Sequence, residues 1–90
     1  MISIVQTLKS EVMIMAEIQQ RIREVVYEMC PERGQNEFAE KLGFSQSTVN
    51  SWCIGRTMPN SFALICIAQA CNVSTDWLLG LSDKKELRDE

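Results

Sequence analysis

Apolar residues along the chain recur at spacings of three and four positions, a pattern typical of amphipathic helices packed on a core. Between residues 18 and 29 the apolar positions are spaced by four, three and four residues, and Pro31 and Gly34 then end the pattern. Glycine and asparagine, which tolerate a left-handed backbone, mark the later helix ends. The sequence therefore predicts five helices, over residues 18–29, 35–42, 46–52, 61–71 and 75–79.

Two of these helices flank a short turn at Gly43. Glycine allows the chain to turn sharply because it adopts the left-handed backbone conformation without steric cost. Ser45 then provides a typical N-cap side chain for the next helix. Val49 and Trp52 lie three positions apart, which places both on the buried side of that helix and favours a core role for Trp52 over base stacking.

The outward side of the helix over residues 46–52 is polar but carries no charge. It is formed by Gln46, Ser47, Asn50 and Ser51. A helix face exposed to solvent normally carries Lys and Glu, whereas amides and hydroxyls form hydrogen bonds with base edges in the DNA major groove. The pattern alone also fits an ordinary serine-rich surface helix, so the surrounding sequence has to distinguish the two interpretations.

From residue 18 to residue 83 the chain resembles the Cro and phage-repressor type of helix-turn-helix domain, also called the xenobiotic-response-element family. The resemblance rests on separated pieces that occur in the expected order and with the expected gaps: RIREV, Gln35, AEKLG, SQSTVNSW, Gly55 with Arg56, Pro59, IAQA and VSTDWLLGLSD. Agreement spread over so much of the chain is far more specific than one short motif. It implies an all-α, five-helix Cro/repressor-like fold, and the apolar spacing of the preceding residues adds an N-terminal helical extension.

The resemblance implies a sequence-specific DNA-binding transcriptional regulator, a dimeric repressor that reads the major groove with the helix at residues 45–52. The implied base contacts are Gln46, Ser47, Asn50 and Ser51, and the implied DNA-backbone contacts are Gln35, Ser45 and Arg56. Gln35 opens its helix, where free backbone amides attract a phosphate, and its side chain is placed to brace Gln46. Double-stranded DNA and a second copy of the chain are the expected partners.

The alternative function is a protein-interaction module, antitoxin-like or adaptor-like, that keeps the helix-turn-helix fold with little intrinsic DNA affinity. Its support is the net charge of −3, since DNA-binding domains usually carry a basic surface. Cys53 and Ile54 also occupy positions where polar or charged side chains are expected. Residues 18–60 contain five basic and five acidic side chains, which predicts a neutral DNA-facing region whose binding depends only weakly on salt.

Candidate dimer-interface residues occur at both ends of the chain. Trp77 and Leu81 lie in and just after the last predicted helix, and for Trp77 a core position and a dimer surface are about equally favoured. At the other end, an apolar stripe through Ile4 and Leu8 continues into the helix at residues 18–29, which suits one long helix. This extension is expected to pair with a second chain; the alternatives are that it folds back or is a dispensable leader.

Ninety residues predict one small domain without an additional effector domain. The expected division is an N-terminal extension over residues 1–17, the DNA-binding domain over residues 18–83 and a charged tail over residues 84–90. No apolar run approaches the roughly 18 residues of a membrane span, and the amino terminus lacks an export signal, so a cytoplasmic location is expected.

The sequence offers little for catalysis or metal binding. It contains no histidine, no glycine-rich phosphate loop and no CxxC pair. The cysteines Cys30, Cys53, Cys66 and Cys71 are expected to be free thiols, with Cys71 in the core. Oxidation of Cys53, at the end of the polar-faced helix, is a minor hypothesis for a change in DNA contact. No enzyme activity, cofactor, metal or small-molecule ligand is expected.

Overall fold

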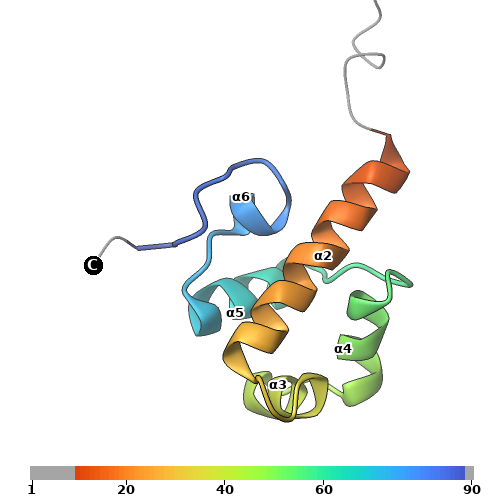
Figure 1. Ribbon diagram of the computed structural model, residues 1–90, viewed down its shortest axis with the longest axis vertical. Coiled ribbons are helices and arrows are strands. Elements are labelled where there is room, and N and C mark those ends of the chain that lie inside the picture. The colour runs from red at the N-terminus through yellow and green to blue at the C-terminus, as the bar shows by residue number, and fades with distance from the viewer. Residues whose placement is uncertain (1–9, 89–90) are drawn as a thin grey trace, which may run out of the picture.

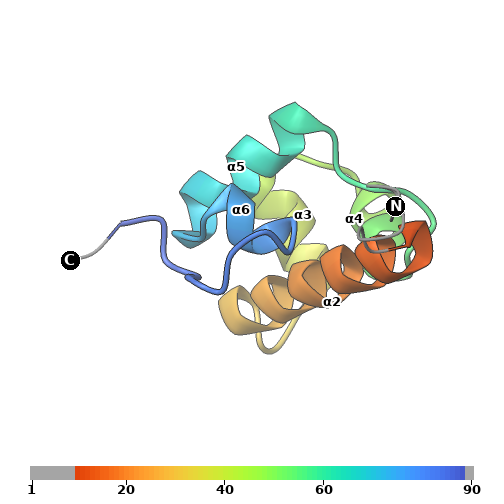
Figure 2. The same ribbon diagram turned by 90° about the horizontal axis from the view of Figure 1, so that it is seen from above.

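The computed structural model describes residues 10–88, in which the regular elements are five helices (Figure 1). Their bounds are α2 Glu11–Met29, α3 Gln35–Leu42, α4 Gln46–Cys53, α5 Ser61–Cys71 and α6 Thr75–Leu78. The long helix α2 crosses one side of the molecule, and α5 lies on the other side, with α3 and α6 between them (Figure 2). None of the described helices is both long and apolar enough to cross a membrane.

Helix α2 begins well before residue 18 because Ser10 caps it. Ser10 Oγ accepts a hydrogen bond from the Met13 amide at 3.2 Å, and Ser10 itself has an extended backbone. The expected domain boundary after residue 17 therefore falls inside a continuous helix. The extended backbone at Ser10 also shows that a single uninterrupted helix starting near Ile4 is wrong. Ile4 and Leu8 themselves lie outside the described residues.

The core lies between α2 and the shorter helices. The predicted apolar stripe of α2 is confirmed at Ile18, Ile22 and Val25, which are at most 5% exposed. The largest fully buried side chains are Phe38, Ile22, Ile67, Leu78, Val25, Val26, Val49 and Cys30. Burying a side chain of this size contributes about 1.5–3 kcal/mol, so these contacts hold the short helices against α2.

The caps predicted for the last two helices are confirmed. Asn60 Oδ1 accepts a hydrogen bond from the Ala63 amide at 2.9 Å at the start of α5. Ser74 Oγ accepts one from the Trp77 amide at 2.9 Å at the start of α6. Asn72 ends α5 in the left-handed conformation, with φ of 53°. Each cap satisfies backbone groups that the helix cannot pair internally.

Residues 84–88, the described part of the predicted charged tail, pack on the domain. Val73 and Glu86 form an antiparallel bridge, and the Ser74 amide donates to the Lys85 carbonyl at 2.8 Å. Lys85 Nζ also lies 2.8 Å from Glu24 Oε2 on α2. The expected end of the domain at residue 83 is therefore too early, because backbone and ionic contacts continue beyond it.

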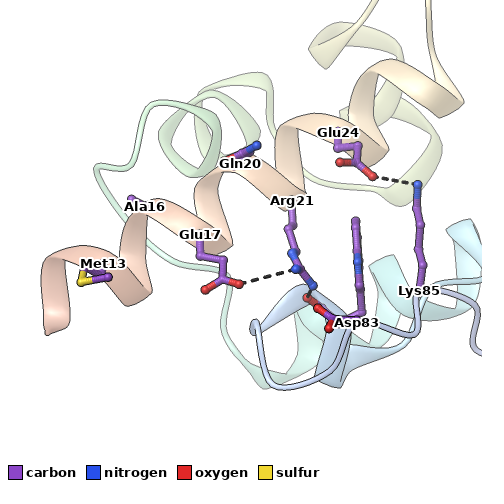
Figure 3. A pocket seen from close by; sticks show the side chains of 9 residues that line it. Met13, Ala16, Glu17, Gln20, Arg21, Glu24, Asp83 and Lys85 are labelled. Atoms are coloured by element: carbon purple, nitrogen blue, oxygen red, sulfur yellow. Dashed lines mark hydrogen bonds and ion pairs between the residues drawn. The ribbon is translucent and has the colours of Figure 1, made fainter. Parts of the chain in front are cut away.

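Trp77 is a core residue, which corrects its assignment as a candidate dimer-interface residue. It is only 6% exposed, and both Arg21 and Lys85 lie over its ring, with Arg21 Cζ 4.8 Å and Lys85 Nζ 5.0 Å from the ring centroid. Arg21 also donates to the Trp77 carbonyl at 2.6 Å. A groove lies between α2 and the C-terminal segment. Figure 3 shows Arg21 beside Glu17 and Lys85 beside Glu24 in it. These cations cover the ring, so it is not available to a partner.

Candidate nucleic-acid interface

Helix α4 starts at the predicted side-chain cap. Ser45 Oγ accepts a hydrogen bond from the Thr48 amide at 3.1 Å and forms another with Thr48 Oγ1 at 2.7 Å. Gly43, with φ of 82°, provides the sharp turn just before this cap. The Ser45 hydroxyl therefore holds the first turn of α4, and its contact with the DNA backbone stays a prediction.

The polar side of α4 faces solvent. Three of the four predicted base-contacting residues are exposed: Gln46, Ser47 and Asn50. The fourth, Ser51, is partly buried. On the opposite side, Val49 is fully buried and Trp52 is 4% exposed, with its ring edge-on to Phe44 at a centroid distance of 5.2 Å. The predicted core role of Trp52 is confirmed, and the anchored helix presents an uncharged polar face.

Gln35 is the first residue of α3, as predicted, and is partly buried. The residue before it, Gly34, makes no side-chain cap to the helix and has φ of 56°. Amide groups in the first turn of α3 thus lack a side-chain cap. No hydrogen bond joins Gln35 to Gln46 among residues 10–88, so the bracing contact expected between them is not formed.

Gln19 on α2 fixes the carboxyl end of α4, a role that no motif in the sequence indicates. Its Nε2 donates to the Cys53 carbonyl at 3.0 Å. Gly55, which follows α4 with φ of 80°, lies so close that a Cβ there would be 2.6 Å from Gln19 Oε1. Gly55 is favoured by its positive φ, and a Cβ there would in addition displace the end of the Gln19 side chain that bonds to Cys53. In the sequence, the only sign of this role is that Gln19 is a polar residue directly after the apolar Ile18.

The geometry of α3 and α4 agrees with what a comparison of the sequence with protein families finds. Residues 35–78 match a family model described as helix-turn-helix. Residues 35–78 thus form a helix-turn-helix domain of this family. The matched helix-turn-helix segment runs from the start of α3 to the end of α6.

Among curated proteins, the helix-turn-helix chain is similar to one named an uncharacterized HTH-type transcriptional regulator from Haemophilus influenzae. The two are 37% identical over 57 residues, which cover 63% of this chain and 24% of the relative. The chain thus spans about a quarter of the length of the curated relative it matches. No solved structure matches the chain.

Cys53, at the end of the second helix of the helix-turn-helix, is a core position and not the surface position expected from the sequence. It is 3% exposed, and burial raises the pKa of its thiol. A buried, protonated thiol reacts slowly, which weakens the hypothesis of regulation by oxidation. Ile54, by contrast, is 50% exposed and remains an apolar departure at the edge of the helix-turn-helix.

Most basic side chains near the helix-turn-helix are neutralised locally. Arg33 lies 3.3 Å from Glu40, and Lys41 lies 3.1 Å from Glu37, in ion pairs between side-chain atoms. Arg21 is held by Glu17 and by backbone carbonyls. Within the described part of residues 18–60, only two basic side chains have no ion-pair or hydrogen-bond partner: Arg23 and Arg56. This region therefore has few cations free to meet DNA phosphates.

The four thiols are free in the helix-turn-helix structure. Cys71 is only partly buried but packs against the core, and burial raises the pKa of its thiol to about 11. Across residues 10–88, no group of three or more His, Cys, Asp or Glu side chains is arranged to hold a metal ion.

Of the candidate dimer residues, Leu81 is 76% exposed. Its place in an interface stays a prediction.

Proposed function

We propose that the protein is a sequence-specific DNA-binding transcriptional regulator, a dimeric repressor that places α4 in the major groove. The observation that carries the proposal is the exposed uncharged face of α4, formed by Gln46, Ser47 and Asn50, on a helix fixed to the core. Glutamine and asparagine form paired hydrogen bonds with adenine, and serine pairs with several bases. The Haemophilus influenzae relative is named a transcriptional regulator, which supports the same function for this chain.

The remaining contacts in this proposal position the protein without reading bases. Gln35 and the uncapped amides at the start of α3 meet one phosphate, while Ser45 and Arg56 meet the backbone on either side of α4. Two protomers bind half-sites about 34 Å apart, which is one helical turn of DNA. Repression then follows because a protein seated on a promoter excludes the polymerase.

Selection from random duplex DNA tests the proposed function. The full 90-residue chain should enrich an inverted repeat whose half-sites contain adenine and have centres about 10 base pairs apart. The selection should be run at low and at moderate salt, because a nearly neutral interface loses affinity early. If no sequence is enriched at either salt concentration, base reading by α4 is ruled out.

The salt dependence of DNA binding should be shallow. Arg23 and Arg56 are the unpaired cations of the described part of residues 18–60, so a dimer neutralises about four phosphates with them. The slope of log K against log salt concentration is then about −4. Fluorescence anisotropy with the selected site across a salt series measures it. A slope steeper than about −6 would show that the DNA contacts extend well beyond these residues.

The second candidate function is a protein-interaction module that retains the helix-turn-helix fold. The net charge of −3 and the half-exposed Ile54 beside α4 favour it. The same selection separates the two candidates, because an interaction module enriches no DNA sequence even at low salt.

A further inference from the structure

Helix α5 has an apolar outer face that no other described element covers. Among its exposed residues, Phe62, Ile65 and Gln69 lie along one helical stripe at intervals of three and four residues, with the partly buried Cys66 beside them. Phe62 is 68% exposed and Ile65 is 52% exposed, although both are large apolar side chains. We call this stripe the α5 outer face. A surface helix normally places charged residues on such a face, so the apolar residues here indicate a contact with another molecule.

The absence of charge on α5 favours a second copy of the chain as the molecule that contacts this face. From Ser61 to Cys71 there is no Asp, Glu, Lys or Arg. In a two-fold symmetric interface each patch meets its own copy, so any charge near the axis meets a like charge. An uncharged face avoids this repulsion, even though the chain as a whole carries a net charge of −3. The α5 outer face is therefore suited to self-association.

The position of the α5 outer face relative to α4 favours the same partner. The Phe62 ring is edge-on to Phe44 with a centroid distance of 6.4 Å, and Phe44 packs in turn against Trp52 of α4. Contacts made by α5 are thus connected to α4 through three aromatic rings. Two protomers joined through this face would hold their two α4 helices in a fixed relation, as two half-sites in DNA require.

We propose that the α5 outer face is the surface through which two copies of this chain pair. The choice of a second copy as the partner rests in part on the proposed function, since base reading needs two linked α4 helices. Helix α5 has 11 residues and is about 16 Å long, so the interface is smaller than the roughly 800 Å² per partner of a standard stable complex. The free dimer is consequently weak, with a dissociation constant in the micromolar range, and DNA stabilises it by binding both protomers.

Sedimentation equilibrium of the full chain without DNA, at total concentrations from about 1 to 500 μM, tests this proposal. Wild-type protein should show a monomer–dimer equilibrium. Phe62→Asp should raise the dimer dissociation constant at least about 30-fold, the effect expected of a hot-spot residue. An acidic residue in the first turn of a helix is tolerated well, so this variant keeps its fold, which circular dichroism checks. Ile65→Asp, on the same face, provides a second variant with the same expected result.

Substitution of an equally exposed large residue outside the candidate interfaces serves as the matched control. Tyr27→Asp on α2 changes a side chain that is 52% exposed, as Ile65 is, and should leave dimerisation unchanged. The proposal is overturned if wild-type protein stays monomeric up to 500 μM, if Phe62→Asp and Ile65→Asp dimerise like wild type, or if the control abolishes the dimer instead.

This experiment and the DNA selection fail independently. A wild-type monomer that still enriches a DNA sequence would overturn the α5 interface and leave the proposed function intact. A dimer that is lost in Phe62→Asp but enriches no DNA would overturn the proposed function and leave the interface intact.

Discussion

Replacement of Gln46 by alanine should weaken binding to the selected DNA site by about 10- to 100-fold for each protomer. Gln46 is exposed at the first position of α4, and a paired hydrogen bond to a base contributes about 1–3 kcal/mol of discrimination. Its side chain is exposed, so the free energy of unfolding should change by less than about 0.5 kcal/mol. Anisotropy titrations with the selected site and with a scrambled site measure both affinity and specificity.

The ratio of the affinities for the selected and the scrambled site separates a loss of base reading from a general loss of DNA affinity. Gln46→Ala should narrow the difference between selected and scrambled DNA, whereas Arg56→Ala should weaken binding to both about equally. Gln20→Ala is a matched control, because Gln20 is also an exposed glutamine but lies on α2. If Gln46→Ala binds the selected site like Gln20→Ala does, α4 does not read bases through this residue.

Replacement of Trp52 by alanine should destabilise the protein by about 3–5 kcal/mol, the usual cost of removing a large buried aromatic side chain. Trp52 is 4% exposed and packs edge-on against Phe44, so its removal leaves a cavity beneath α4. A domain of this size has a total stability of roughly 5–10 kcal/mol, and much of the variant should be unfolded at 37 °C. Urea unfolding followed by circular dichroism measures the change.

Tyr27→Ala is the control for this substitution, because Tyr27 is an aromatic residue that is 52% exposed. It should cost less than about 1 kcal/mol. A Trp52→Ala variant of wild-type stability that had lost DNA affinity would contradict the core assignment and favour base stacking.

Local features of this protein followed from its sequence with little ambiguity. Ser45, Asn60 and Ser74 cap the helices predicted for them, because a short polar side chain satisfies amides only three residues away. The spacing of Val49 and Trp52 likewise identified the buried side of α4. Such features depend on neighbours within one helical turn, which the sequence itself specifies.

Long-range contacts were not predictable in the same way. The bond from Gln19 to the Cys53 carbonyl joins residues 34 positions apart, and neither residue type signals it. Lys85 reaches Glu24 across 61 positions, which is why the predicted charged tail proved to be part of the domain. A charge pattern indicates that a residue needs solvent or a partner but does not say which.

The sequence by itself determined where α3, α4, α5 and α6 begin, which side of α4 is buried and which side is polar, since these depend on propensity, capping and periodicity. Only the tertiary structure decided that Trp77 is covered by two cations, that Cys53 is buried, and that the α5 outer face is left open. These outcomes depend on which helices pack together and on the side chains that meet there. For a chain of 90 residues with one small core, that packing decides which apolar residues remain on the surface.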